Sequence, residues 1–171
     1  MPQIKIREWN EKPRTKLRFI KIGDIFCYQF SEEMFVFGQI LGKVNVGHVI
    51  QFFDIFQASP TITVEELSRA QFIGKPIIID SYTLFDRSPV WSWQIIGHQA
   101  DFDPSPFKDL AFKWGDPNGL HFGKVWLDGR TEPKIFSREE VEDLDWEACV
   151  GSIVYNRILE EELASRGNKG V

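Results

Sequence analysis

The chain has 171 residues, of which 43% are hydrophobic and 14% aromatic, and its net charge is −5. A chain of this length can bury a core without disulfides or metal ions, and this hydrophobic content excludes an intrinsically disordered protein. The acidic balance disfavours a nucleic-acid-binding protein, because contact with phosphates requires a basic face.

The charge is unevenly distributed along the chain. Residues 1–21 hold seven Lys or Arg against two Glu, whereas residues 101–165 hold fifteen acidic against seven basic side chains. An acidic excess keeps a protein in solution. It also complements a basic protein partner, since opposite potentials accelerate and orient association.

The first half of the chain favours sheet. Ile4 and Ile6 alternate with charged residues, which predicts a short edge strand inside an N-terminal extension of residues 1–18. We expect strands over 19–30, 34–41 and 48–56, joined by short turns into an antiparallel meander, with a bulge or turn at Gly23 and Asp24.

The middle of the chain mixes both element types. Thr63 and Glu66 match a capping box, which predicts a short helix through about Ala70. Strands are expected over 75–80, 91–97 and 124–127. Residues 101–106 read as a loop, and residues 115–119 as a turn-rich stretch.

Two helical signals follow in the last third. Ser137 and Glu140 match a second capping box. Residues 153–164 predict an amphipathic helix, ahead of a frayed tail over 166–171. The apolar stripe of that helix is expected to comprise Ile153, Val154, Arg157, Ile158 and Leu163.

Together these elements predict one domain over residues 1–171, of the α+β class. Its main element is a curved, mainly antiparallel sheet of six to eight strands. Two or three helices accompany the sheet, one of them C-terminal.

The sequence contains no complete motif for phosphate binding or nucleophilic catalysis, because the candidate residues have the wrong spacing or are expected to be buried. Gly119 and Gly123 are one residue too close for a phosphate loop, and Val125 cannot bind Mg²⁺ as the loop requires. No Gly-x-Ser-x-Gly elbow is present. Cys27 and Cys149 have apolar neighbours, so we expect both to be buried, reduced thiols without a catalytic role.

Metal and acid–base chemistry have no motif either. His48, His98 and His121 show no ligand spacing, so we expect no metal and no cofactor. One enzymatic alternative stays open, a small-molecule site that uses His98 or His121 together with Asp101.

A binding surface is the remaining functional hypothesis. Carboxylates crowd residues 139–147, where they form either a solvated face or a docking surface for a basic partner. Trp114, beside Gly115, is the best candidate for an exposed anchor, because Trp is enriched in interface hot spots. The candidate contact residues are Asp101, Asp103, Trp114, Asp116, Glu139, Glu140, Glu142 and Asp143.

Targeting signals are not evident. Residues 1–18 are charged and no signal-peptide core follows them. No apolar run approaches the roughly 18 residues that span a bilayer. We therefore expect a cytoplasmic protein that does not associate with membranes.

The strand segments resemble a known family. The segments 20–30, 37–41 and the apolar strand ending at Phe53 and Asp54 look like the opening of the immunity protein 26 family of bacterial polymorphic toxin systems. The strand over 91–97 is similar to the second half of that family. The resemblance covers residues 19–100 well and the last third of the chain loosely.

This resemblance implies an immunity protein of a contact-dependent inhibition system. Such a protein binds the toxin domain that sibling cells deploy and blocks it without catalysis. Toxin nucleases are commonly basic, which suits an acidic inhibitor. The alternatives are an interaction module of the same fold with another partner, and the enzyme described above. The resemblance assigns no binding residues, so the candidate contact set rests on charge and exposure alone.

Overall fold

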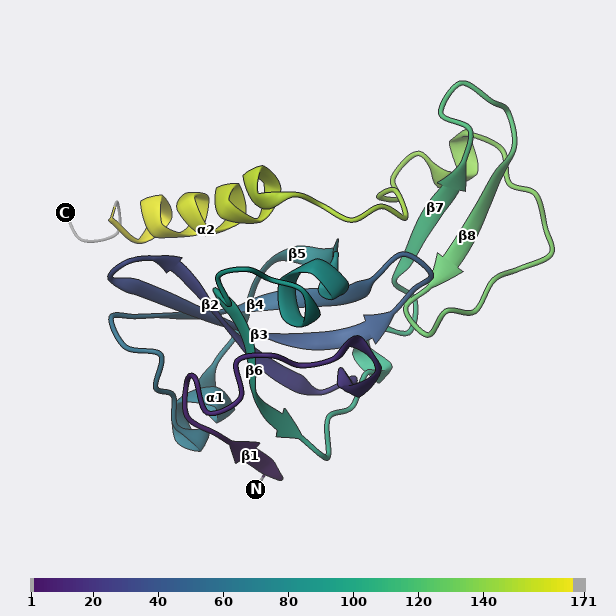
Figure 1. The fold of residues 1–171 in the computed structure, drawn as a ribbon. Helices are drawn as coiled ribbons and strands as arrows, with labels where there is room; N and C mark the ends of the chain where they lie inside the picture. The colour runs from purple at the N-terminus through teal and green to yellow at the C-terminus, as the bar shows by residue number, and fades with distance from the viewer. Residues whose placement is uncertain (1, 168–171) are drawn as a thin grey trace.

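A six-stranded antiparallel sheet and a separate β-hairpin organise the computed structural model, which describes residues 2–167 (Figure 1). The strand order of the main sheet is β1-β6-β2-β3-β4-β5. Its strands are β1 (Ile4–Ile6), β2 (Asp24–Ser31), β3 (Met34–Lys43), β4 (His48–Gln57), β5 (Phe72–Ile79) and β6 (Trp93–Gln99). The hairpin pairs β7 (Ala111–Gly115) with β8 (Phe122–Trp126), and the α-helices are α1 (Val64–Arg69) and α2 (Ser152–Gly167). The predicted α+β class is confirmed, with a C-terminal helix and eight strands among the described residues.

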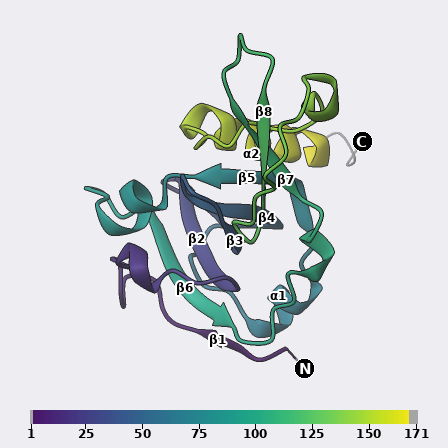
Figure 2. The same ribbon diagram turned by 90° about the vertical axis from the view of Figure 1, so that its right-hand side faces the viewer.

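The main sheet is strongly curved (Figure 2). The predicted meander of β2, β3 and β4 is present, and β1 occupies the sheet edge beside β6, as expected. Register shifts interrupt the β2–β3, β2–β6, β3–β4 and β4–β5 pairings. Bulges of this kind bend a strand and increase its twist, so they account for the curvature.

The strand predicted to begin at residue 19 begins instead at Asp24. Leu17–Phe19 form a 3₁₀ turn, and Gly23 has a φ of +87°. Only glycine adopts this conformation readily, so the chain turns at Gly23 before it enters β2. The turn predicted at Gly23 is therefore confirmed, but the residues before it lie outside the sheet.

Trp93 is the centre of the core on one face of the sheet. Its ring contacts five others, with centroid distances from 4.4 Å to Tyr28 up to 6.0 Å to Phe85; the other three belong to Phe26, Phe52 and Tyr155. Tyr155 and Leu159 bring α2 onto this face. The opposite face carries a second cluster that includes Cys27 and Leu67 of α1. The sheet is thus covered on both sides, as Figure 1 shows.

The buried face of α2 differs from the predicted stripe. Tyr155 and Leu159 are buried, whereas Ile153 and Val154 are exposed. The docking face is set by long-range contact with Trp93 rather than by the count of aliphatic residues. α2 also includes Arg166 and Gly167, so the prediction that the frayed tail begins at residue 166 is wrong; residues 168–171 lie outside the described part of the chain.

Both predicted capping boxes form. At α1, the Thr63 hydroxyl accepts from the Glu66 backbone N–H and the Glu66 carboxylate accepts from the Thr63 backbone N–H, at 3.1 and 2.8 Å. Ser137 and Glu140 make the same reciprocal pair, but only the 3₁₀ turn Glu139–Val141 follows it. None of the helices within residues 2–167 is long and apolar enough to cross a membrane.

Candidate protein-binding surface

Residues 111–147 form a small unit built on the β7–β8 hairpin, here called the hairpin module, which projects from the main sheet (Figure 1). Backbone hydrogen bonds join Lys113 to Asp145 and Glu147, so residues 145–147 cover the free edge of β7. Phe122 and Phe136 exchange two backbone bonds at 3.1 and 2.8 Å, which covers the edge of β8. Both hairpin edges are therefore paired within the module, which protects them from association with other strands.

Apolar side chains attach the module to the sheet and fill its interior. Phe112 and Val125 pack with Leu41 and Ile78 of the main sheet. A separate cluster of Phe122, Phe136 and Val141, with Leu144 against it, lies within the module itself. The module is thus held by its own small core and by one face of the hairpin.

Every basic side chain of the module lies over an aromatic ring. The cation-to-centroid distances run from 4.3 Å for Lys124 over Phe136 to 5.3 Å for two other pairs. The remaining pairs are Lys113 over Trp146, Arg130 over Trp126, Lys134 over Phe136 and Arg138 over Phe122. Cation–π contacts of this kind stabilise the ring and hold the positive charge against the protein.

The acidic side chains of the module are arranged differently. The module has nine acidic and five basic residues, a surplus of four negative charges. Some carboxylates are engaged, such as that of Glu140, which accepts from Lys134 Nζ at 2.6 Å and from the Ser137 backbone. These bonds lower the pKa of Glu140 to about 2. Among the described residues, no side-chain hydrogen bond or ion pair involves the carboxylates of Glu132, Glu139, Glu142 and Asp143. The charged groups of the module that have no side-chain partner among the described residues are therefore mainly negative.

The structure brings together six of the eight predicted contact residues. Trp114, Asp116, Glu139, Glu140, Glu142 and Asp143 all belong to the hairpin module. Arg138 fixes the acidic turn to the hairpin loop, because its Nη2 donates to the carbonyl oxygens of Pro117 and Gly119 at 2.9 and 3.0 Å.

Trp114 is 48% exposed. Its indole lies across Gly123, where a Cβ atom would overlap the ring. The absence of a side chain at residue 123 therefore allows this tryptophan to lie flat on β8.

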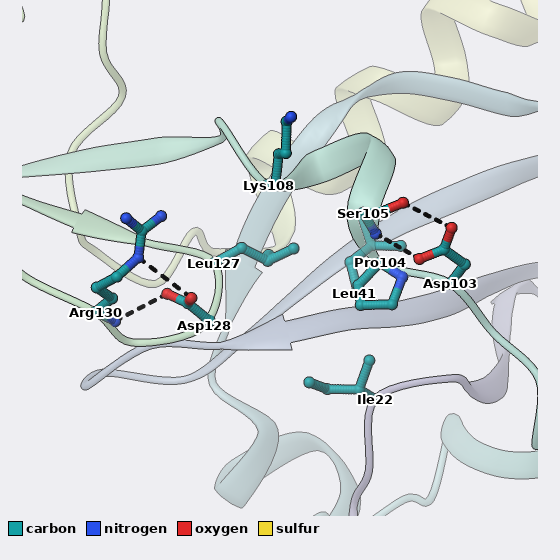
Figure 3. Close-up of a pocket in the computed structure, with 9 residues that line it drawn as sticks. All are labelled: Ile22, Leu41, Asp103, Pro104, Ser105, Lys108, Leu127, Asp128 and Arg130. Carbon is teal, nitrogen blue, oxygen red and sulfur yellow. Dashed lines mark hydrogen bonds and ion pairs between the residues drawn. The ribbon is translucent and has the colours of Figure 1, made fainter.

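Asp101 and Asp103 lie outside the module. The Asp101 carboxylate accepts from the Gln3 backbone N–H at 2.9 Å, beside β1. Asp103 lines a hollow of about 230 Å³ between residues 103–108 and the turn at 127–130 (Figure 3). The floor of this hollow is apolar, and its other lining residues are Ile22, Leu41, Pro104, Ser105, Lys108, Leu127, Asp128 and Arg130.

The two carboxylates at the rim of this hollow are held by their own turns (Figure 3). Asp103 accepts from the Ser105 backbone at 2.9 Å and from its hydroxyl at 2.6 Å, and both bonds lower the pKa of Asp103. Asp128 accepts from the backbone and Nε of Arg130 at 3.0 and 3.3 Å. An apolar floor with a polar rim can receive an apolar side chain.

Two of the three histidines have structural partners, whereas His121 is an exposed residue directly before β8. His98 Nδ1 lies 2.8 Å from Asp24 Oδ1, across the β2–β6 pair, rather than beside Asp101. His48 Nδ1 lies 2.8 Å from the Ser81 hydroxyl, and burial lowers the pKa of His48 to about 4. No group of three or more His, Cys, Asp or Glu that could hold a metal ion occurs among the described residues.

The two cysteines differ, and the prediction for one of them is wrong. Cys27 is buried on β2, where burial raises the pKa of its thiol. Cys149 is exposed, and its thiol donates to the Val46 carbonyl at 3.1 Å. Apolar sequence neighbours predicted burial for both, but Cys149 lies in an irregular segment before α2 whose neighbours do not enclose it.

Sequence reasoning missed three features of this surface. Leu120, at the hairpin loop, is 77% exposed, and strand β7 was not predicted. The available signal was the apolar pair Ala111 and Phe112 ahead of the turn at 115–119. The cation–π pairs also escaped notice, although bases and aromatic residues alternate closely over 122–138.

The comparisons with known proteins assign the scaffold. The sequence model of the family described as Immunity protein 26 matches residues 21–121, which extend from the turn before β2 to the loop before β8. No curated protein and no solved structure matches the chain. The family match spans more than half of the chain and takes in the curved sheet from β2 to β6. On this ground the chain belongs to the immunity protein 26 family.

Proposed function

We propose that this protein is a cytoplasmic immunity protein that binds and neutralises a cognate bacterial toxin domain, without catalysis of its own. The observation that carries the proposal is the family match over residues 21–121. The partner is a protein, and neutralisation follows when the bound chain occludes the toxin's active site or its path for substrate.

The hairpin module is the contact surface that we propose for the toxin. Trp114 and Leu120 supply exposed apolar area, and Trp is the residue type most enriched in hot spots. Glu139, Glu142 and Asp143 supply negative charge that has no side-chain partner within residues 2–167, while the bases of the module lie over its rings. A basic toxin, such as a nuclease, complements this surface. The negative electrostatic potential of the surface guides the toxin toward it.

The limits of the family match favour the same surface. The match ends at residue 121, whereas eight of the nine module acids lie at residues 128–147. The matched residues build the curved sheet, which every member needs in order to fold. Recognition of one particular toxin requires residues that belong to this chain, and the unmatched part of the module supplies them.

Co-expression with the toxin tests the function directly. The toxin domain encoded beside this gene is expressed in a bacterial host, with and without the full-length chain. We expect growth to cease with the toxin alone, to recover with the chain, and a stoichiometric complex to be purified. Recovery of growth without a complex would count against neutralisation by binding.

Two matched sets of variants test the surface. The triple variant Glu139→Gln, Glu142→Gln and Asp143→Asn removes three of the four module carboxylates that have no side-chain partner among the described residues, and we expect toxin association on the order of ten-fold slower at low salt. Trp114→Ala is expected to accelerate dissociation. The control triple Glu33→Gln, Glu160→Gln and Glu161→Gln removes equal charge elsewhere on the surface. Equal rates for the two triples, or rates independent of salt, would exclude this surface.

A further inference from the structure

A second hollow, of about 480 Å³, lies where the N-terminal extension meets the turn η2 (Tyr82–Asp86). Its lining contains five basic residues and a single acidic one. The lining residues are Arg14, Lys16, Leu17, Arg18, Lys43, Asp86 and Arg87. The excess of positive charge contrasts with the net charge of −5 of the whole chain.

The single carboxylate is committed to holding the extension in place. Nε and Nη2 of Arg14 both donate to Asp86 Oδ1, at 2.9 and 2.7 Å. The backbone N–H of Leu17 donates to Oδ2 at 2.9 Å. The Leu17 bond, followed by the Arg14 bonds, lowers the pKa of Asp86, so the carboxylate is ionised. Asp86 thereby fixes residues 14–17 beside η2 and its charge is balanced by Arg14.

Four further bases remain around the hollow. Lys16, Arg18, Lys43 and Arg87 are exposed, and none of them forms an ion pair within residues 2–167. The three segments that carry them are held together by the fold, so their like charges repel one another. A bound anion would relieve this repulsion and accept hydrogen bonds from several of the donors at once.

Two exposed aromatic rings flank the basic residues. The Arg18 guanidinium lies 4.9 Å from the ring of Phe19, which is 49% exposed. The Arg87 guanidinium lies 5.5 Å from the ring of Tyr82, and its Nε donates to the Tyr82 hydroxyl at 3.0 Å. Stacking orients each guanidinium while leaving donors free for a ligand. Such rings can also receive a planar base.

We propose that this hollow binds a phosphate group, either as inorganic phosphate or as the phosphate of a mononucleotide. Phosphate provides several strong acceptor oxygens and carries close to two negative charges at neutral pH, which suits a cluster of Arg and Lys donors. The hollow is larger than a phosphate alone and has room for an attached sugar. A long polyanion is disfavoured, because residues 101–165 carry eight more acidic than basic side chains.

The test titrates the full chain with inorganic phosphate, with AMP and with a short single-stranded RNA, by calorimetry and ³¹P NMR. The variant Lys16→Gln/Arg18→Gln is compared with the control Lys5→Gln/Lys108→Gln, which has the same net charge. We expect the control variant to bind each ligand as tightly as the wild type does. The variant Lys16→Gln/Arg18→Gln should bind each ligand on the order of ten-fold more weakly. Tighter binding of AMP than of phosphate assigns the ligand as a nucleotide, and equal binding assigns it as phosphate itself.

Two results would overturn the proposal: equal weakening in both variants, or binding of the RNA without binding of either monophosphate. Melting curves monitored by circular dichroism confirm that the variants fold. The proposal is independent of toxin binding, so Lys16→Gln/Arg18→Gln is expected to protect against the toxin as wild type does.

Discussion

The main sheet and the hairpin module use aromatic residues in opposite ways. In the sheet, the ring of Trp93 is enclosed by five other rings and is 1% exposed. In the module, the rings of Phe122, Trp126, Phe136 and Trp146 face cations, and Trp114 faces solvent. The sheet is therefore stabilised by burial of its aromatic rings. The module combines a small apolar core with cation–π contacts at its surface. This difference fits the division proposed above between a scaffold and a surface for binding.

The largest effect is expected at the centre of the sheet. Trp93→Ala removes a fully buried ring and should lower the free energy of unfolding by about 3–5 kcal/mol, measured by urea denaturation. Trp93→Phe keeps an aromatic ring and provides a folded variant with a smaller loss. The matched variant Trp114→Ala should cost about 1 kcal/mol. Similar losses for Trp93→Ala and Trp114→Ala would remove the contrast between the two regions.

A buried histidine makes the stability of the sheet depend on pH. Burial, with the charge of Lys43 as a second cause, lowers the pKa of His48 from 6.5 to about 4. The unfolded chain therefore binds more protons than the folded one between these values. The contribution of His48 to the free energy of unfolding is therefore fully present above pH 6.5. It is lost as the pH falls to 4, by about 3 kcal/mol in total.

Urea denaturation between pH 4 and 7.5 checks this effect. The free energy of unfolding should change less with pH in His48→Gln than in the wild type. NMR of the folded wild type should show the His48 ring titrating near the lower end of the range from pH 4 to 6.5. A ring that titrates near 6.5 in the folded protein would contradict the prediction.

A smaller, local effect is expected in the module. Arg138→Ala removes two hydrogen bonds to the hairpin loop and the stacking on Phe122. The free energy that protects amides of residues 115–121 from hydrogen exchange should fall by about 1–2 kcal/mol. Protection of β2 to β4 should not change. Arg157→Ala, at an exposed position of α2, is the control. Loss of protection throughout the sheet would show that the module is not a separate unit.

Local patterns predicted the sheet better than the module. The meander of β2 to β4 follows from alternating apolar residues and short turns, and both capping boxes are local spacings. The buried face of α2 could not be predicted in this way, because Tyr155 is buried through its contact with Trp93, which is 62 residues distant in the sequence. Charge counts selected seven of the candidate contact residues, and the position beside Gly115 selected Trp114; six of these eight residues lie in one module. Charge counts could not reveal that Arg138 and Phe122 make contact, because that pairing depends on the folded hairpin.

The smallest effect concerns the segment that links the module to α2. Cys149 is exposed and lies between the two regions, whereas Cys27 lies under α1 in the sheet. A thiol reagent should therefore label one cysteine per folded chain and two in denaturant.

Burial raises the pKa of Cys149, with the negative charge of Asp80 as a second cause, so labelling should be slow at pH 7 and faster at higher pH. Cys149→Ser should abolish the native labelling and change the free energy of unfolding by less than about 0.5 kcal/mol. Labelling of both thiols in the folded state would mean that the sheet opens as readily as the linking segment, against the contrast between the two regions.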